Sequence, residues 1–255
     1  MNATERFTEL VTGPEERLPL DEAALLVAAH DHPVDVNGEL ERLDALARDA
    51  PGDTGALARH LFVERGFAGN SVDYSDPRNS FLDEVMRRRL GLPITLSVLM
   101  IEVGRRRGLA LAGVGMPGHF LVRGAPGEFF DPFHGGEPLD EAGCRARFAA
   151  TQGAAEFEPE YLEPVGANAI LARMLANLVR TYVERSPADA VWALRLRLLV
   201  PGVSPGERRQ AARLLATLGR FEEAAAALET LAPLLPDADE ADARRDARRL
   251  RARSN

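Results

Sequence analysis

The sequence predicts an α+β protein in which a small antiparallel sheet packs on a buried central helix, followed by an all-helical region. Apolar residues recur at helical spacing through most of residues 20–108 and again from residue 167 onward. Between these stretches, residues 109–133 contain short apolar runs separated by glycine and proline turns, which is typical of strands. This order of helices, strands and helices favours the α+β class.

The composition is typical of a globular protein. Of the 255 residues 45% are apolar and 27% are charged, and the formal net charge is −8 at pH 7. No apolar run is long enough to cross a bilayer, and the N-terminus shows no basic segment followed by an apolar core. We therefore expect a cytoplasmic protein with no membrane partner. The negative charge argues against nucleic acid as a partner.

The N-terminal part is predicted to be a tail followed by amphipathic helices. Residues 1–18 are polar and show no periodicity, which predicts a flexible tail. Helical spacing then recurs in three segments that each end at glycine or proline, namely 20–33, 35–51 and 53–67. Residues 68–80 form a predicted loop rich in Asn, Asp, Ser, Gly and Pro, and Ser80 is expected to cap the helix that follows.

The most apolar helix is predicted over residues 92–108. Pro93 suits its first turn, and apolar residues follow on nearly every side as far as Val103. A helix that is apolar all round is a buried helix. This segment is therefore expected to run through the middle of a domain that spans residues 19–165.

Two short strands after the central helix carry a histidine and an aspartate. The stretch HFLVR begins at His119 and the stretch EFFDPF contains Asp131, with a Gly-Ala-Pro-Gly turn between them. In a hairpin centred on Ala125 these two residues lie directly opposite each other, with Cβ atoms roughly 5 Å apart. The carboxylate can then orient the imidazole, as in a catalytic triad. The inference depends on the register, because a one-residue slip puts the two side chains on opposite faces.

The C-terminal part, residues 166–255, is predicted to be wholly helical. The stretch 205–237 contains Leu218-Gly219 followed by closely spaced alanines, and it closes at Pro236. This pattern is similar to a tetratricopeptide unit, in which small residues let paired helices pack closely. An independent solenoid needs about three such units and this region has one, so it is expected to pack against the first domain.

Four motifs occur in one order at compatible spacing. They are Asn79-Ser80, Gly91-Leu92-Pro93-Ile94, Gly118-His119-Phe120 and Asp131-Pro132-Phe133. With them the chain resembles the SirB-type, transglutaminase-like bacterial proteins over residues 20–235, the tetratricopeptide-like part included. The resemblance implies a papain-like core in which a cysteine begins the central helix and a histidine and an aspartate lie on consecutive strands. His119 and Asp131 match the last two, but the chain has Pro, Ile and Thr at residues 93–95, where the cysteine is expected.

The nucleophile of any chemistry at this site is therefore not evident. A helix N-terminus and a neighbouring imidazolium lower the pKa of a thiol and so activate it for attack on an amide carbon. Cys144, the single cysteine, lies beyond the strand pair and is expected to be a small buried apolar residue. The hydroxyls nearest the expected position belong to Thr95 and Ser97. They either attack with His119 as base or hydrogen-bond back to helix carbonyls.

Further residues are expected to border the same pocket, namely Asn79, Ser80, Pro93, Gly118, Phe120 and Phe133. His134 adds a third possibility, because two histidines and a carboxylate, here His119, His134 and Asp131, can hold iron or zinc. In the alternative interpretation His134 caps the turn at Gly135-Gly136. We expect no metal and no cofactor.

The favoured hypothesis is a transglutaminase-like protein without the usual nucleophile. Its His119/Asp131 cleft and helical region then bind a peptide or protein partner. The alternative is an amide or ester hydrolase, or an acyltransferase, in which Thr95 or Ser97 attacks and Asp131 orients His119 as base. Catalysis requires a hydroxyl within reach of the imidazole and donors for an oxyanion, whereas binding requires only a shaped cleft. A metal site at His119, Asp131 and His134 is the weaker third hypothesis.

Overall fold

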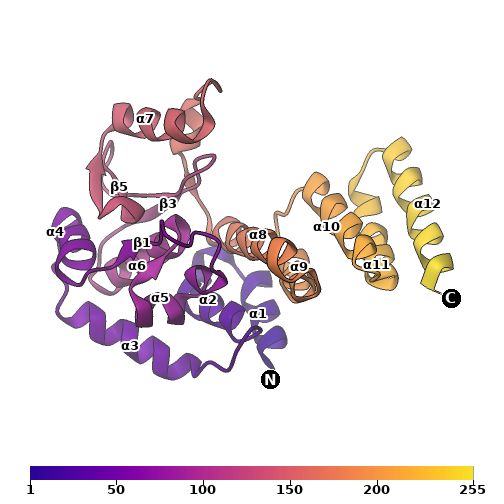
Figure 1. The fold of residues 1–255 in the computed structure, drawn as a ribbon, viewed down its shortest axis with the longest axis horizontal. Coiled ribbons are helices and arrows are strands. Elements are labelled where there is room, and N and C mark those ends of the chain that lie inside the picture. Colours follow the sequence, from indigo (N-terminus) through magenta and orange to yellow (C-terminus); the bar gives the residue numbers. More distant parts are fainter. Residues whose placement is uncertain (255) are drawn as a thin grey trace. The chain divides into compact units, whose positions relative to one another are not determined.

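The chain forms two compact units (Figure 1). The computed structural model describes the fold of residues 1–254, and the first unit is Met1–Met174. The helices of this unit are α1 (Ala3–Thr12), α2 (Leu20–Ala28), α3 (Val36–Arg48), α4 (Thr54–Arg59), α5 (Leu82–Arg88), α6 (Pro93–Arg106) and α7 (Glu141–Gln152). Its strands are β1 (Ala68–Gly69), β2 (Leu90–Gly91), β3 (Ala112–Val114), β4 (Leu121–Arg123), β5 (Phe129–Asp131), β6 (Glu137–Leu139) and β7 (Pro164–Val165).

The main sheet is antiparallel, with the strand order β6-β5-β4-β3-β7. One face packs against α7, where Cys144 and Phe148 join Val114, Leu121 and Phe129 in one apolar cluster. The opposite face is covered by α6, which contacts β3 and β4 (Figure 1). This arrangement confirms the predicted mixture of helices with a small antiparallel sheet.

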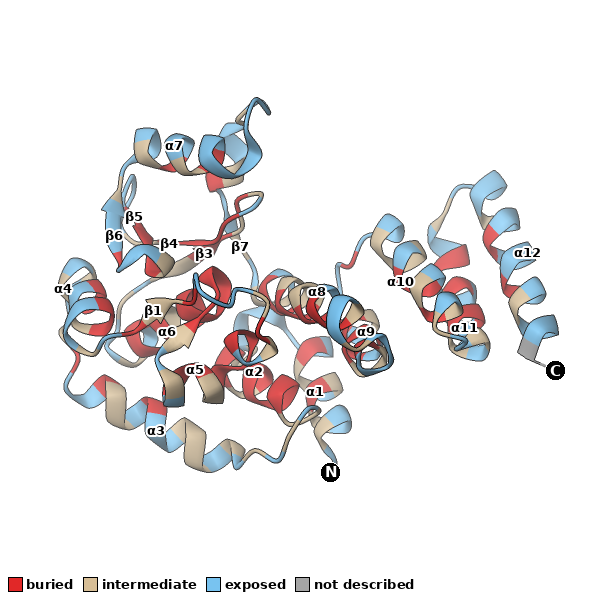
Figure 2. Cartoon of the chain, viewed as in Figure 1, coloured by how far each residue is buried: buried red, intermediate tan, exposed pale blue. Residues whose placement is uncertain are grey.

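The central helix α6 is buried on nearly every side, as predicted (Figure 2). Its buried residues are Pro93, Ile94, Thr95, Leu96, Ser97, Val98, Leu99, Met100, Glu102, Val103 and Gly104. Burying one such large apolar side chain stabilises a fold by roughly 1.5–3 kcal/mol, so this helix is a major source of stability. Neither α6 nor any other described helix combines the length and the hydropathy needed to cross a membrane.

The β4–β5 hairpin differs from the predicted register by two residues. Val122 pairs with Phe130, because Pro126 and Gly127 occupy the middle of the turn and Gly127 takes φ +81°. Each residue therefore faces a partner two positions later than a hairpin centred on Ala125 requires. A shift of two residues keeps every side chain on its face of the sheet. The predicted pairing was wrong in register, but the two site residues still share one face.

The N-terminal residues form a helix, so the predicted flexible tail over residues 1–18 was wrong. Asn2 and Glu5 form a capping box at the start of α1, each side chain accepting a hydrogen bond from the other's backbone N–H. Phe7 and Val11 lie one turn apart and are completely buried where α1 packs against α2. Phe7, Leu10 and Val11 are in fact spaced as on one side of a helix, so the sequence contains this pattern and the prediction overlooked it.

The boundary of the first unit lies later in the chain than residue 165. α8 spans Ala167–Arg185, and the two units divide between Met174 and Leu175 within it. The beginning of α8 belongs to the first unit because Ile170 lies against Gly113 of β3. Sequence periodicity shows only that α8 is helical and carries no information about which unit each of its turns packs on.

The second unit is helical throughout its described part, as predicted. Its further helices are α9 (Ala190–Leu199), α10 (Pro205–Thr217), α11 (Phe221–Leu231) and α12 (Asp237–Ser254). Small residues bring the last three helices together, since Ala212, Ala225 and Ala247 are buried in one cluster with Leu228 and Leu231.

A buried cluster of charges fixes the C-terminal end of α6. Arg106 donates to Asp21 of α2 at 2.7 Å and to Asp44 of α3 at 2.6 Å, so it joins three helices. Arg105 and Arg106 also bind Glu102 at 2.8 and 3.1 Å. Burial, reinforced by the nearby charge of Asp21, raises the pKa of Glu102 to about 7. The arginines hold the pKa of Asp21 below its usual range, although burial of that carboxyl opposes this effect.

Replacing Glu102 with Gln is expected to change how stability depends on pH. A carboxyl with a raised pKa in the folded state contributes stability below its ordinary pKa, and this contribution is lost as pH rises through about 7. Between about pH 5 and pH 8 the free energy of unfolding of the wild type should therefore fall by on the order of 2 kcal/mol. That of Glu102→Gln should not show this decrease. Urea unfolding at both pH values measures the difference. Glu141→Gln, at an exposed ion pair, is the control. If Glu102→Gln shows the same pH dependence as the wild type, the raised pKa of Glu102 is contradicted.

Candidate functional site

Asp131 is the centre of the candidate site. It ends β5, is fully buried, and its Oδ1 accepts 3.2 Å hydrogen bonds from the backbone N–H groups of Phe133 and His134. These bonds cap the helical turn Pro132–His134 (η4). Its Oδ2 accepts a 2.8 Å hydrogen bond from Nδ1 of His134. His119, two residues before β4, places Nε2 2.9 Å from Oδ1. One carboxylate thus lies between two imidazoles.

The Asp131 carboxylate is ionised despite its burial. Burial alone raises the pKa of this carboxyl, but the contacts with His119 and His134 lower it more, so the pKa lies below its usual range. Arg147 of α7 adds a permanent positive charge, with Nε 3.0 Å from Oδ2, and its Nη2 binds Glu137 of β6. The site therefore holds a negative charge at neutral pH in a fixed place.

The close contact between His119 and Asp131 is not a well-aligned hydrogen bond. Although Nε2 lies 2.9 Å from Oδ1, it has no hydrogen-bond partner of acceptable direction in the described part of the chain. The imidazole is only 6% exposed. Its ring meets Phe133 edge-on at a centroid distance of 6.3 Å and lies 5.5 Å from the ring of His134. Charge and ring packing, rather than a directed hydrogen bond, hold this imidazole.

The backbone around His119 is held separately from its side chain. Gly118 has φ +74°, and a Cβ there would lie 2.3 Å from Nε2 of Gln152, so this turn requires glycine. Arg173 of α8 donates 2.8 Å hydrogen bonds to the backbone oxygens of Met116 and His119. Gly118 therefore serves the site through its conformation.

Aromatic rings connect His119 to an exposed loop. Phe133 contacts Tyr74 edge-on at 5.9 Å, and its ring packs so closely on Gly69 that a Cβ there would clash with it. Tyr74 is 43% exposed, and Val72 in the same loop is 97% exposed. We call the three residues Val72, Tyr74 and Phe133 the apolar rim.

Asn79 joins this loop to the start of α6. Its fully buried side chain donates to the backbone oxygens of Asp73 and Tyr74 at 2.7 and 3.3 Å. Its Oδ1 accepts a 3.0 Å hydrogen bond from Asn70, and its backbone oxygen accepts one of 3.1 Å from Leu92, just before α6. Asn79 was expected to border the pocket directly, and in the structure it positions the loop that carries Tyr74.

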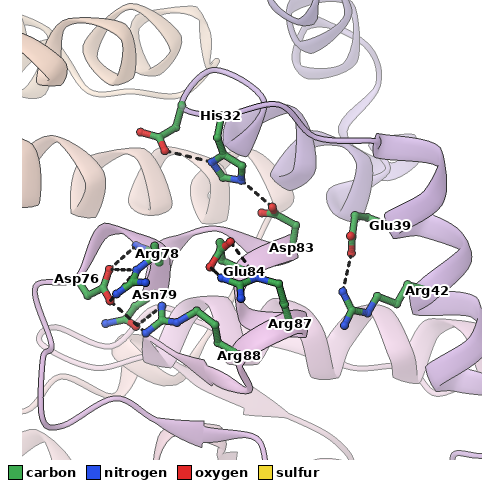
Figure 3. A network of polar contacts seen from close by, with 11 residues as sticks. His32, Glu39, Arg42, Asp76, Arg78, Asn79, Asp83, Glu84, Arg87 and Arg88 are labelled. Carbon is green, nitrogen blue, oxygen red and sulfur yellow. Dashed lines mark hydrogen bonds and ion pairs between the residues drawn. The ribbon is translucent and has the colours of Figure 1, made fainter.

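The turn Pro77–Ser80 is fixed by Asp76 (Figure 3). The Asp76 side chain accepts a 3.0 Å hydrogen bond from the backbone N–H of Arg78 and forms ion pairs with Arg78 and Arg88. The resulting 3₁₀ turn ends at Ser80, and α5 begins only at Leu82. The expectation that Ser80 caps this helix was wrong. Its buried Oγ has no hydrogen-bond partner in the described part of the chain.

Comparison with known proteins identifies the family to which the chain belongs. A family model described as the transglutaminase-like superfamily matches residues 26–176, which include α6, His119 and Asp131. The chain belongs to the transglutaminase-like superfamily.

Relatives of this transglutaminase-like chain occur in bacteria and animals. It is 38% identical over 215 residues to a UPF0162 protein of Xylella fastidiosa, covering 76% of each chain. To a UPF0162 protein of Vibrio cholerae it is 32% identical over 136 residues, 51% of this chain and 50% of the other. To F-box only protein 21 of Mus musculus it is 32% identical over 130 residues, 47% of this chain and 20% of that protein. No solved structure matches the chain.

The two candidate hydroxyls of the transglutaminase-like domain lie in the core. Thr95 and Ser97 on α6 are both completely buried. Ser97 donates a 2.8 Å hydrogen bond to the backbone oxygen of Pro93, so this hydroxyl is satisfied within its own helix. The Oγ1 atom of Thr95, in the first turn, has no hydrogen-bond partner among the described residues.

Two of the expected pocket residues belong to the core. Pro93 is buried as the first residue of α6. Phe120 is 1% exposed, and its ring lies against Gly113 and beneath the guanidinium of Arg173 at 5.4 Å from the centroid. Among the residues expected to border the pocket, Phe133 makes the ring contact with His119.

Three residues that contact the site, Arg147, Arg173 and Tyr74, were not predicted from the sequence. Each lies on a different element from the residue that it contacts, and no local motif marks it. The sequence weakly indicates that Arg147 faces the sheet. It lies three residues after Cys144 and therefore on the same side of α7 as that buried side chain.

Cys144 lies apart from the start of α6, in the apolar cluster between α7 and the sheet. It is completely buried. Burial, and then the negative charges of Asp140, Asp131 and Glu141, raise the pKa of this thiol to about 12. Both effects disfavour the thiolate, which is the reactive form.

Cys144 is therefore expected to resist thiol reagents in the native protein. A pKa of about 12 instead of 9.0 reduces the thiolate fraction about 1,000-fold near neutral pH, in addition to steric protection. Ellman's reagent at about pH 8 should label less than a tenth of the thiol on a timescale that labels the urea-unfolded chain completely. Cys144→Ser serves as the blank. Fast labelling of the native protein that disappears in His119→Ala would instead mark a reactive thiol.

Proposed function

We propose that this transglutaminase-like protein binds an extended peptide segment of a partner protein noncovalently, without a cysteine nucleophile. The observation that carries the proposal is the apolar rim, because Tyr74 is exposed and contacts Phe133, whose ring contacts His119, and Val72 of the same loop is exposed as well. Isolated exposed apolar residues are ordinary, but these lie on a loop that a buried asparagine holds in place. The rim offers contacts for an apolar side chain, and the half-exposed imidazole of His134 offers a polar contact to a peptide backbone.

The state of the candidate nucleophiles supports binding over acyl transfer. Ser97 is hydrogen-bonded within α6, and Cys144 lies in another cluster with a raised pKa. An activated nucleophile requires a neighbouring base that receives its proton. Among the described contacts of His119, the polar side-chain partner is Asp131.

We also propose that the chain is a cytoplasmic, SirB-type protein whose C-terminal helices form a tetratricopeptide-like partner surface. Within the second unit, a groove of about 460 Å³ is lined by residues of α10, α11 and α12. Its lining includes apolar Leu228 and Leu250 and the cations Arg213, Arg249 and Arg253. A groove of this kind supports peptide recognition through the helical region.

A peptide selected on the full-length chain is expected to bind at the rim. Panning a random peptide phage library should enrich sequences with a common apolar residue, and fluorescence anisotropy then gives the Kd of a labelled peptide. Tyr74→Ala removes an exposed aromatic contact and should raise this Kd at least about 10-fold, as does Val72→Asp.

Leu234→Asp is the matched control, because Leu234 is also an exposed apolar residue but lies outside the rim. It should leave the Kd unchanged. The binding proposal fails if no sequence is enriched, or if Leu234→Asp weakens binding as much as Tyr74→Ala while all three variants unfold like the wild type.

One observation favours acyl transfer as a second candidate function. The hydroxyl of Thr95 is buried without a hydrogen bond in the first turn of α6, and a buried polar atom without a partner needs an explanation. In this mechanism His119 takes the Thr95 proton while Oγ1 bonds to a carbonyl carbon. The imidazolium then returns that proton to the leaving group, and water hydrolyses the acyl-threonine.

Intact-mass spectrometry after exposure to activated esters and fluorophosphonates separates the two functions. Binding without catalysis predicts no adduct in the wild type or in His119→Ala. A stoichiometric adduct mapped to Thr95 that His119→Ala lacks would establish the acyl-transfer function in place of the binding function.

A further inference from the structure

Three side chains of the site form a compact set of potential metal ligands. One nitrogen from each of His119 and His134 and one carboxylate oxygen of Asp131 all lie within 4.8 Å of one another. Ligand atoms around a tetrahedral zinc ion are separated by about 3.3 Å, given bond lengths of about 2.0 Å. Small side-chain adjustments are therefore sufficient to place all three around one ion.

The buried nitrogen of His119 is the second observation that points to an ion. His119 is 6% exposed, and its Nε2 faces Asp131 at 2.9 Å without making a hydrogen bond. Buried polar atoms in native proteins nearly always have a partner, because leaving one unpaired costs roughly 1–3 kcal/mol. A metal ion bound by Nε2 and the carboxylate would give this buried nitrogen a partner.

The carboxylate is already arranged as a ligand held by its surroundings. Two backbone N–H groups fix Asp131, and His134 is 43% exposed, so an ion can enter from solvent. Arg147 lies 3.0 Å from Oδ2 and opposes a cation. Glu137 binds the same guanidinium and compensates its charge, so the group of Asp131, Glu137 and Arg147 keeps one net negative charge.

We propose that His119, Asp131 and His134 bind a divalent transition-metal ion of the zinc class, with at least one coordination position open. Two imidazoles and one carboxylate are a donor set that zinc accepts, and three protein ligands leave a position for an external donor. This inference does not depend on the proposed peptide binding. The metal and the peptide can be tested separately.

A second cluster provides an internal comparison. His32, Asp83 and Glu84 also bring ligand atoms within 4.8 Å of one another. Both nitrogens of His32 already contact carboxylates, Asp31 at 3.1 Å and Asp83 at 2.7 Å (Figure 3), and Glu84 pairs with Arg87. Oδ1 of Asp83 is buried without a hydrogen bond, but both nitrogens of the only histidine in this cluster are already engaged, so we expect no metal there.

The test is titration of the metal-stripped 255-residue protein with Co²⁺ followed by displacement with Zn²⁺. We expect one Co²⁺ per chain, with visible absorption of the strength given by four- or five-coordinate cobalt, and complete displacement by one equivalent of Zn²⁺. His134→Ala removes one exposed ligand and should weaken Zn²⁺ affinity at least about 100-fold, more than loss of an outer-sphere partner does. His32→Ala should bind like the wild type.

Thermal unfolding, monitored by circular dichroism, distinguishes a variant that has lost the metal site from one that no longer folds. Without metal, His134→Ala should still unfold in one cooperative transition, at a lower temperature than the wild type because Asp131 loses the hydrogen bond from Nδ1 of His134. Zn²⁺ should raise the unfolding temperature of the wild type and of His32→Ala, and should not raise that of His134→Ala. The proposal is overturned by absence of binding, by full affinity in His134→Ala, or by loss of binding in His32→Ala. The peptide Kd is measured in EDTA, where no metal is bound, so it does not depend on any of these outcomes. A negative result for the metal site therefore does not contradict the proposed peptide binding.

Discussion

The burial of α6 on nearly every side is the constraint on which the first unit depends. A helix without a solvent-facing side is stable only when neighbours cover it completely, and α2, α3, α4, α5 and the main sheet all contact it. Its two ends are fixed by polar contacts. Arg106 joins the C-terminal end to Asp21 and Asp44, and the backbone of Leu92 joins the N-terminal end to Asn79. The element that forms the core therefore also positions the loop beside the site.

At the site, one buried carboxylate organises groups from several elements. Asp131 caps η4, contacts both imidazoles and pairs with Arg147 of α7. The position of His119 is set by its backbone, through Gly118 and Arg173, as much as by Asp131. A histidine held in this way can polarise a reacting group, contact a bound peptide or ligate a metal ion. Which of these it does depends on the group that enters the site.

The transglutaminase-like fold does not itself determine the chemistry. The superfamily match includes His119 and Asp131, whereas the first turn of α6 carries Thr95 with a buried hydroxyl. The relatives include UPF0162 proteins of bacteria and an F-box only protein of mouse, of which this chain covers 76% and 20% respectively. Function has to be argued from the side chains at the site, because one fold can hold sites of different chemistry.

Local patterns in the sequence were sufficient to predict the α+β class, the buried α6 and the shared face of His119 and Asp131. They depend on spacings of two to four residues, which the sequence displays directly. The register of the β4–β5 hairpin was missed by two residues because Pro126 and Gly127 selected the turn. The helix α1 was overlooked although Phe7, Leu10 and Val11 have helical spacing and Asn2 and Glu5 match a capping box.

The sequence by itself therefore determined the α+β class, the buried central helix α6 and the placement of His119 and Asp131 on one face of the sheet. The tertiary structure alone decided that Asn79 holds the Tyr74 loop, that Arg147 reaches Asp131 and that Nε2 of His119 lacks a hydrogen bond. These contacts depend on directions that side chains take only after the chain has packed, so no local spacing encodes them.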